Sequence, residues 1–199
     1  MTRRLVQLFV GLGLYGATMA MLVRSGLGLD PWDVFHEGLA HHLPLTFGQV
    51  VIAVGAAVLL LWIPLRQRPG FGTVANVIVI GLAADATLAV LPRAEHAAFA
   101  VTLLVAGVVG NGLAGALYVG AGLGPGPRDG LWTGVVARTG LSVRLVRTVL
   151  EVTVVVAGFA LGGTVGAGTV LYALTIGPIV QFFLPWCEAR PRAVAPATS

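Results

Sequence analysis

Three charged side chains lie close together in an otherwise apolar stretch late in the chain. Arg144, Arg147 and Glu151 are separated by three and four residues, a spacing that puts them on nearly one face of a helix. Charged groups inside a membrane are costly, and they mark a substrate or ion pathway or pair with each other. Two interpretations therefore stand. Glu151 and Arg147 neutralise each other within a helix bundle, or they contact a substrate or a coupling ion.

Asp85 is a second acidic residue in an apolar stretch, near one end of that stretch. Its carboxylate either belongs to a pathway, or reaches the membrane interface or a polar group on a neighbouring helix. Gln181 occupies the corresponding position in the repeat described below and is a weaker candidate of the same kind.

Two motifs rich in glycine and proline contain further candidates. Gly26–Gly38 has the sequence GLGLDPWDVFHEG, and Gly122–Gly134 has the sequence GLGPGPRDGLWTG. A proline followed two residues later by aspartate is typical of a helix N-terminus, whose positive end attracts anions. Asp33 and Asp129 are thus either caps of tight turns or parts of a binding site.

Arg128, beside Asp129, is the better candidate for contact with an anion, because a guanidinium binds carboxylate or phosphate through two parallel hydrogen bonds. Gly177 and Pro178 are predicted to interrupt the last apolar stretch, at a position that matches Gly81 in the repeat. Paired interruptions of this kind indicate a binding site, although glycine also lets membrane helices pack closely.

Histidines cluster in the segment His36–His42, which has the sequence HEGLAHH. A zinc protease helix needs its second histidine four residues after the first, and position 40 is alanine. We therefore expect an exposed polar segment there and no metal site. The sequence also lacks a recognisable nucleophile–base pair and a phosphate-binding loop, so it predicts neither an enzyme nor a cofactor.

Six long apolar stretches must position these side chains. Of the 199 residues, 57% are hydrophobic and 10% charged, whereas soluble domains carry roughly 25% charged residues. The sequence predicts an all-α membrane protein, because about 20 apolar residues cross a bilayer as a helix. The polar connections Pro31–Leu43 and Pro127–Thr139 are predicted to form short interfacial or re-entrant helices. The six predicted transmembrane helices are Leu5–Val23, Phe47–Leu65, Phe71–Leu91, Ala98–Val119, Val143–Leu161 and Val165–Cys187.

All 12 basic residues are arginine, and 8 residues are acidic, for a formal net charge of +4. With six spans, ten of the 12 arginines fall on one side of the membrane, and only Arg24 and Arg93 on the other. Basic residues concentrate on the cytoplasmic side of membrane proteins, so both termini are predicted to be cytoplasmic. The partner of this positive charge is then the lipid bilayer and not nucleic acid.

The chain contains an internal repeat with an offset of 96 residues. Each copy holds three spans, an odd number, so the second copy must lie upside down relative to the first, as is common in secondary transporters. Residues 1–95 form the first predicted three-helix repeat, residues 96–188 the second, inverted one, and residues 189–199 a disordered cytoplasmic tail. Matching pairs are Gly26 and Gly122, Pro31 and Pro127, Asp33 and Asp129, and Thr73 and Thr169.

The same motifs resemble those of the YczE/YyaS/YitT family of bacterial integral membrane proteins, and the YczE branch most. The resemblance also rests on Arg147, on Glu151 and on Ile176-Gly177-Pro178, and it extends from about Arg4 to Pro185. It implies a multi-pass protein of the bacterial cytoplasmic (inner) membrane. It marks the motif residues as important positions and implies no particular substrate or reaction.

The inverted repeat favours a small-molecule transporter or exporter with its site between the repeats. The alternative is a non-transporting accessory or scaffold protein for a cytoplasmic enzyme, which would dock on Gly122–Ser142. A segment of this length offers little of the roughly 800 Å² per partner that a stable interface buries. A homo-oligomer is compatible with either function. Candidates for the substrate or ion pathway are Glu151, Arg147, Arg144, Asp85, Gln181, Arg128, Asp129, Asp33, Gly177 and Pro178.

Overall fold

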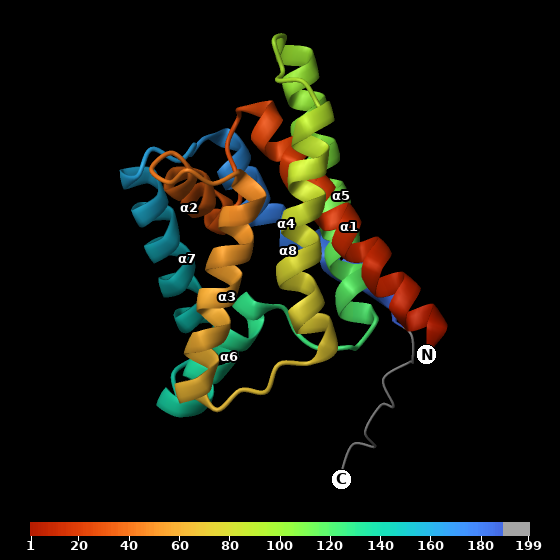
Figure 1. Ribbon diagram of the computed structural model, residues 1–199, viewed down its shortest axis with the longest axis vertical. Helices are drawn as coiled ribbons and strands as arrows, with labels where there is room; N and C mark the ends of the chain where they lie inside the picture. Colours follow the sequence, from red (N-terminus) through yellow and green to blue (C-terminus); the bar gives the residue numbers. More distant parts are fainter. Residues whose placement is uncertain (189–199) are drawn as a thin grey trace.

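The computed structural model describes residues 1–188, and the tail predicted at 189–199 lies outside the described residues. The described part consists of eight α-helices and contains no strand (Figure 1). The helices are α1 (Thr2–Ser25), α2 (Pro31–Ala40), α3 (Phe47–Leu65), α4 (Phe71–Val90), α5 (Ala97–Gly120), α6 (Pro127–Thr139), α7 (Val143–Ala160) and α8 (Ala167–Cys187).

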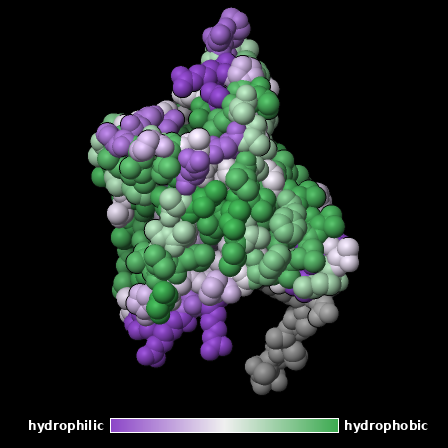
Figure 2. Space-filling model, viewed as in Figure 1, coloured by the Kyte–Doolittle hydropathy of each residue, from purple (hydrophilic) through white to green (hydrophobic). Residues whose placement is uncertain are grey.

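Five of these helices, α1, α3, α4, α5 and α8, are long and apolar enough to cross a membrane. Figure 2 shows apolar side chains over the middle of the molecule and hydrophilic ones gathered at its two ends, the pattern expected of a protein that spans a bilayer. The sixth predicted span corresponds to α7, which has 18 residues. It differs from the other five in carrying three charged residues, Arg144, Arg147 and Glu151, within these 18 positions.

Local sequence signals set the helix bounds, which lie within about three residues of the predicted ones. Pro31 and Pro127 occupy the first positions of α2 and α6, where a missing N–H costs no hydrogen bond. α3 begins after Thr46, whose hydroxyl accepts a hydrogen bond from the Gln49 amide at 3.2 Å. α2 ends at Ala40, three residues before the predicted end.

The predicted interruption at Gly177 and Pro178 is wrong, because α8 runs without a break from Ala167 to Cys187. Proline removes one backbone donor, and membrane helices tolerate this loss where their surroundings satisfy the freed carbonyl. Gly177 instead leaves one face of α8 open, since a Cβ added there would meet no atom within 4 Å.

α1 and α5 pack along each other, with α4 against α1 and α8 against α5. Small residues permit this close approach. A Cβ added to Gly16 of α1 would overlap the carbonyl oxygen of Ile80 in α4, and one added to Gly112 of α5 would overlap Ile179 of α8.

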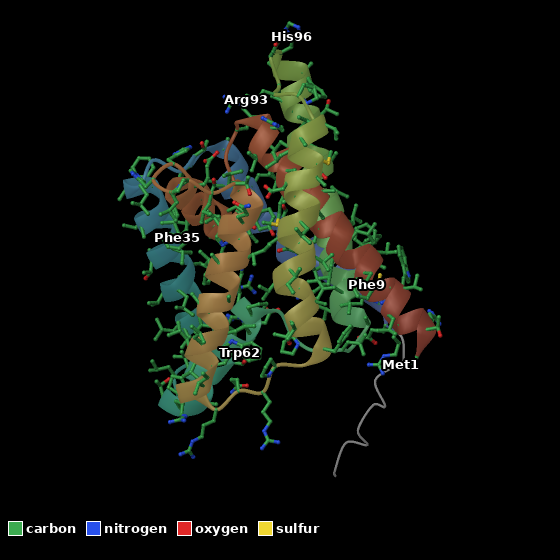
Figure 3. All side chains as sticks on the ribbon, in the orientation of Figure 1. Met1, Phe9, Phe35, Trp62, Arg93 and His96 are labelled. Atoms are coloured by element: carbon green, nitrogen blue, oxygen red, sulfur yellow. The ribbon has the colours of Figure 1, made fainter. Side chains whose placement is uncertain are left out.

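The two short helices each pack on a long helix that is distant in sequence, α2 on α7 and α6 on α3. α2 and α6 lie toward opposite ends of the molecule (Figure 1). Trp62 of α3 lies where α3 meets α6 (Figure 3), and a Cβ on Gly130 of α6 would overlap its indole ring. The glycine therefore seats α6 against this tryptophan.

The loops that lead into α2 and α6 are held by two equivalent hydrogen bonds. The Gly168 amide at the start of α8 donates to the Leu27 carbonyl at 2.8 Å, and the Gly72 amide at the start of α4 donates to the Leu123 carbonyl at 2.8 Å. Each bond joins residues from different halves of the chain. The start of one half's short helix is thus fixed by a long helix of the other half.

The contact between α3 and α4, here called the α3–α4 seam, is closed. A Cβ on Gly48 of α3 would overlap the carbonyl oxygen of Gly81 in α4, so the two backbones touch. Asp85 of α4 accepts hydrogen bonds from the Gly48 amide at 2.8 Å and from the Thr46 hydroxyl. Asp85 thereby satisfies donors at the N-terminus of α3 and holds the seam together.

The corresponding α7–α8 seam is open. Within residues 1–188, α7 and α8 make no contact comparable to that between α3 and α4. The positions that match Gly48, Gly81 and Asp85 hold Arg144, Gly177 and Gln181. A long arginine replaces the glycine, so the backbones stay apart and Gly177 faces open space.

Candidate functional site

A cavity of about 360 Å³ lies where α2 and α6 begin, and all eight helices contribute to its wall. Its size is within the range of about 300–1,000 Å³ that small-molecule sites occupy. Asp30, Trp32 and His36 reach it from the first motif, and Arg128 and Asp129 from the second. The two motifs singled out in the sequence therefore meet at one place.

At the start of α2, two carboxyl groups and an imidazole are buried together. Asp30 is the N-cap, and one of its carboxylate oxygens, Oδ1, accepts the Asp33 amide at 2.9 Å. Asp33 Oδ1 lies 2.9 Å from His36 Nδ1. The three residues are at most 2% exposed.

These positions correct two predictions. The cap is Asp30 and not Asp33, because the aspartate before a proline at the first helical position has its carboxylate next to the free amides. Of the segment His36–His42, His41 and His42 are exposed as predicted. His36 is buried, because α2 packs on α7 and carries this side chain into the interior. His36 lies next to Asp33, and no group of three metal-ligating residues forms within residues 1–188.

The start of α6 has a different chemistry. Its N-cap is Gly126, which has no side chain to cap the helix. The position of this end is fixed by the Thr73 hydroxyl, which donates to the Pro125 carbonyl at 2.7 Å, and by the Trp62 indole N–H, which donates to the Pro127 carbonyl at 3.0 Å. Asp129 accepts a hydrogen bond from the Tyr118 hydroxyl at 3.0 Å.

Arg128 crosses the cavity and connects the two helix starts. One of its terminal nitrogens lies 3.6 Å from Asp30 Oδ2 and the other 3.5 Å from Asp33 Oδ1. The guanidinium carbon lies 5.2 Å from the centre of the Trp32 ring, within the range of a cation–π interaction. The ionic distances are long, and within residues 1–188 the Oδ2 atoms of both aspartates lack a hydrogen-bond partner.

Burial governs the charges at the start of α2, which is not one of the spanning helices. Burial raises the pKa of the Asp30 and Asp33 carboxyls above its usual value, while Arg128 lowers it in part. Burial, together with the charge of Arg128, lowers the pKa of His36. The imidazole is therefore neutral at neutral pH, and with its proton on Nδ1 it donates to Asp33.

α7 and α8 supply the other polar wall of the cavity. Arg147 and Glu151 line it and form an ion pair, in which Arg147 Nε donates to Glu151 Oε1 at 2.7 Å. Their side chains are 53% and 35% exposed, so the pair faces an open space. Gln181 and Gly177 line the cavity from α8.

Four of the predicted site residues do not line the cavity. Asp33 lies behind it and acts through Arg128 and His36. Asp85 belongs to the α3–α4 seam. Arg144 is exposed at the start of α7, and Pro178 follows Gly177 within α8 without reaching the cavity wall.

Comparisons with known proteins place nearly the whole chain in one family. Residues 2–185 match a family of unknown function, DUF6198. The chain belongs to this family. It is 41% identical to an uncharacterised protein of Haemophilus influenzae over 177 residues, which cover 89% of this chain and 81% of the relative. It is 35% identical to the uncharacterised membrane protein YczE of Bacillus subtilis over 179 residues, which cover 89% and 83% of the two chains.

The uncharacterised protein YyaS of Bacillus subtilis is 23% identical over 183 residues, which cover 90% of this chain and 91% of the relative. No solved structure matches. The resemblance to YczE and YyaS drawn from the motifs is confirmed. The DUF6198 match includes every cavity-lining residue. The similarity to the membrane protein YczE and the five long apolar helices identify this chain as a membrane protein.

Several residues of the site were not predicted from the sequence. Asp30 had a usable signal, because Asp-Pro at a helix start indicates a capping aspartate. Tyr15 and Trp132 also line the cavity. Tyr15 had no signal, because aromatic residues in apolar helices are more often part of the core, and Trp132 belongs to the second motif but was not singled out.

Proposed function

We propose that this DUF6198 protein transports a small molecule across the bacterial cytoplasmic membrane and binds it in the cavity between α2 and α6. The observation that carries the proposal is the arrangement of these two short helices, which start at one polar cavity and lie toward opposite ends of the molecule (Figure 1). Half-helices whose N-termini meet near the membrane midplane form the substrate sites of many secondary transporters.

Three equivalences support two inverted three-helix repeats. α2, α3 and α4 begin at residues 31, 47 and 71, and α6, α7 and α8 begin 96 residues later. The bond from Gly168 to Leu27 has its counterpart in the bond from Gly72 to Leu123. Trp32 and Arg128 occupy the same place in the two repeats and stack on each other, as residues beside a two-fold axis do.

The exposed face of α7 supports its role as the sixth span. At 1.5 Å per residue, its 18 residues extend for about 27 Å, close to the thickness of the hydrocarbon core of about 30 Å. Val152, Val156 and Phe159 are 55%, 61% and 65% exposed and follow a helical spacing. An apolar face of this kind requires lipid, while Arg147 and Glu151 point into the cavity.

The difference between the two seams supports alternating access. Asp85 closes the α3–α4 seam at the end of the molecule that holds Arg93 and His96 (Figure 3). Gly177 and Gln181, at the matching positions of the open α7–α8 seam, line the cavity. If the repeats exchange these two arrangements, the cavity opens to the opposite side of the membrane. The arginine distribution favours a cytoplasmic N-terminus, and we assign the described arrangement, with its closed α3–α4 seam, to an inward-open state.

The accessory function has less support. The segment Gly122–Ser142, which would serve as a docking surface, forms α6 and the loops on either side of it. Pro127, Gly130 and Leu131 of α6 are buried, and the helix packs on α3. The main exposed stretch, residues 137–142, is short for a partner interface of standard size.

Cysteine accessibility tests the transport proposal without knowledge of the substrate. Cys187, the single cysteine, is replaced by serine, and Gly177→Cys places a thiol in the cavity where it meets no neighbour. A membrane-impermeant maleimide should label this thiol in inside-out vesicles and not in right-side-out vesicles. Adding Asp85→Asn, which weakens the α3–α4 seam, should increase labelling from the outside.

Leu174→Cys is the matched control, because Leu174 is on the same helix and is 71% exposed on the lipid-facing surface. It should react from neither side. Equal labelling of Gly177→Cys from both sides would indicate a channel. Labelling only after detergent has dissolved the membrane would indicate a sealed interior, and either result contradicts the proposed alternating access.

A further inference from the structure

The charges around the cavity do not balance. Asp30, Asp33, Asp129 and Glu151 are acidic, whereas Arg128 and Arg147 are the basic residues that contact them or line the same wall. His36 is neutral because burial and Arg128 lower its pKa. The N-termini of α2 and α6 supply a partial positive charge of roughly 0.5 each. A net negative charge therefore remains in a site where an anion would add to it.

Two carboxylate oxygens at this site lack a hydrogen-bond donor. Asp30 is 1% exposed and Asp33 is fully buried, yet within residues 1–188 the Oδ2 atom of each carboxylate has no donor. Buried polar atoms are normally satisfied. Asp30 lines the cavity, so a ligand that carries N–H groups and a positive charge would satisfy its free oxygen.

Aromatic side chains complete the environment that an organic cation prefers. Trp32 and Trp132 line the cavity, as do Tyr15, Tyr118 and Tyr172. The electron-rich faces of such rings attract cations. Arg128 already illustrates this chemistry, because its guanidinium lies over Trp32 and beside Asp30 and Asp33. Its long ionic distances and its 28% exposure leave it free to move aside.

We propose that the cavity binds a small monovalent organic cation of the amidinium, guanidinium or amine class, which contacts Asp30 and the aromatic rings and displaces the tethered guanidinium of Arg128. This proposal rests on the transport site proposed above and names its substrate class. One water molecule occupies about 30 Å³ of the liquid, so the cavity of about 360 Å³ has room for roughly a dozen water-sized groups. Displacement of Arg128 would also release the connection between α2 and α6, which links binding to movement of the two repeats.

Benzamidine, benzamide and benzoate provide the test, because they have nearly the same shape and carry one positive charge, no charge and one negative charge. Their binding to the purified protein in detergent is measured by calorimetry. We expect benzamidine to bind about tenfold or more tightly than benzoate, with benzamide between them. At alkaline pH, where Asp30 stays ionised without Arg128, Arg128→Gln should increase the affinity for benzamidine about tenfold, since it removes the internal competitor, and Asp30→Asn should decrease it about tenfold.

Glu95→Gln is the control, because it removes a carboxylate from an exposed position outside the cavity and should leave the affinity unchanged. The gain expected of Arg128→Gln cannot come from a misfolded protein, so the test does not depend on the stability of Asp30→Asn. Stronger binding of benzoate, a loss of benzamidine affinity in Arg128→Gln, or no binding of any of the three compounds overturns the proposal.

Uptake of the same compounds into proteoliposomes separates the two proposals. Benzamidine that binds but does not cross contradicts transport and leaves the cation site intact. Benzoate that crosses, without binding of benzamidine, contradicts the cation site and leaves transport intact.

Discussion

At the start of α2, Asp30 caps the helix, and the carboxylate of Asp33 is buried behind it. At the start of α6, 96 residues later, Gly126 provides no cap, and Arg128 projects from the position that corresponds to Trp32. Both helices begin at a proline and have aspartate at the third position. Two differences between the matching motifs, Asp30 against Gly126 and Trp32 against Arg128, thus give one helix start an acidic group and the other a basic group, and these groups face each other across the cavity.

The α3–α4 and α7–α8 seams also differ because matching positions hold different side chains. Gly48 and Gly81 let α3 and α4 touch, and Asp85 closes the contact, whereas the matching Arg144, Gly177 and Gln181 leave α7 and α8 apart. The side chains at the three matching positions thus account for one closed and one open seam. The two halves of the chain therefore differ in the charge at their short-helix starts and in the packing at their seams.

The largest effect on stability is expected from removal of Arg128, which breaks the charge complementarity of the helix starts. Removing one partner of a buried ion pair typically costs about 3–5 kcal/mol, so Arg128→Gln should lower the melting temperature strongly. A triple variant that combines Arg128→Gln with Asp30→Asn and Asp33→Asn should recover most of the lost melting temperature, because it leaves no unpaired charge. A triple variant no more stable than Arg128→Gln would contradict a charge-based account. Arg138→Gln, on the exposed end of the same helix, is the control.

The same variant should depend on pH in a defined direction. Burial raises the pKa of Asp30 and Asp33 while Arg128 opposes the rise, so its removal raises both values further. The folded state then binds protons that the unfolded state has already released, and stability falls as pH rises. Arg128→Gln should thus lose stability from about pH 4, the ordinary pKa of aspartate, up to neutral pH. A loss that is constant over this range would mean that the effect is steric.

A second prediction sharpens the comparison of the seams. Gly81→Ala places a methyl group against the carbonyl oxygen of Gly48, and overpacking of this kind costs about 1–3 kcal/mol. The matching Gly177→Ala meets no atom within 4 Å and should leave the melting temperature unchanged. Equal effects of the two substitutions on thermal unfolding would show that the seams do not differ in packing.

A third prediction isolates the cap of α2 from its charge. Asp30→Ser keeps an oxygen that accepts the Asp33 amide, whereas Asp30→Ala removes it, and loss of a cap costs about 1 kcal/mol. The alanine variant should therefore be less stable than the serine variant by that amount. At α6, Gly126 leaves the helix uncapped, but a Cβ there would lie 3.2 Å from Asp129 Oδ2 and 3.2 Å from the Tyr118 hydroxyl, so Gly126→Ser should not gain the full stability of a cap. Identical melting temperatures for Asp30→Ser and Asp30→Ala would remove the cap from the account.

Much of this fold was predictable because apolar length and proline position determine membrane helices locally. The apolar stretches gave each long helix within about three residues, and Pro31 and Pro127 marked the starts of α2 and α6. The break expected at Gly177 and Pro178 was wrong, because helix continuity depends on the surroundings of a freed carbonyl, and a sequence pattern does not contain them.

The candidate site was predictable only where a motif carried it. Arg128 and Asp129 were identified from charge beside a helix start, but their partners were not. The ion pairing of Arg128 with Asp30 and Asp33 joins residues almost 100 positions apart, and the burial of His36 depends on α2 packing against α7. Asp85 was a candidate for the pathway and instead holds the α3–α4 seam. Contacts of this range follow from tertiary packing and not from local pattern.

The smallest effect on stability is expected at the ion pair of α7, where the comparison is between Glu151 in the cavity and Asp85 in the seam. Arg147 and Glu151 are four residues apart on one helix and half-exposed, and such pairs contribute about 0.3–0.5 kcal/mol. Glu151→Gln and Arg147→Ala should therefore leave the melting temperature nearly unchanged yet abolish transport in reconstituted vesicles, because both side chains line the cavity. Asp85→Asn should leave the benzamidine affinity of the cavity unchanged, because Asp85 does not line it. It should instead weaken the closed α3–α4 seam. Normal transport by Glu151→Gln and Arg147→Ala would reduce the pair to a means of neutralising two charges inside the bundle, and the cation site would then rest on α2 and α6 alone.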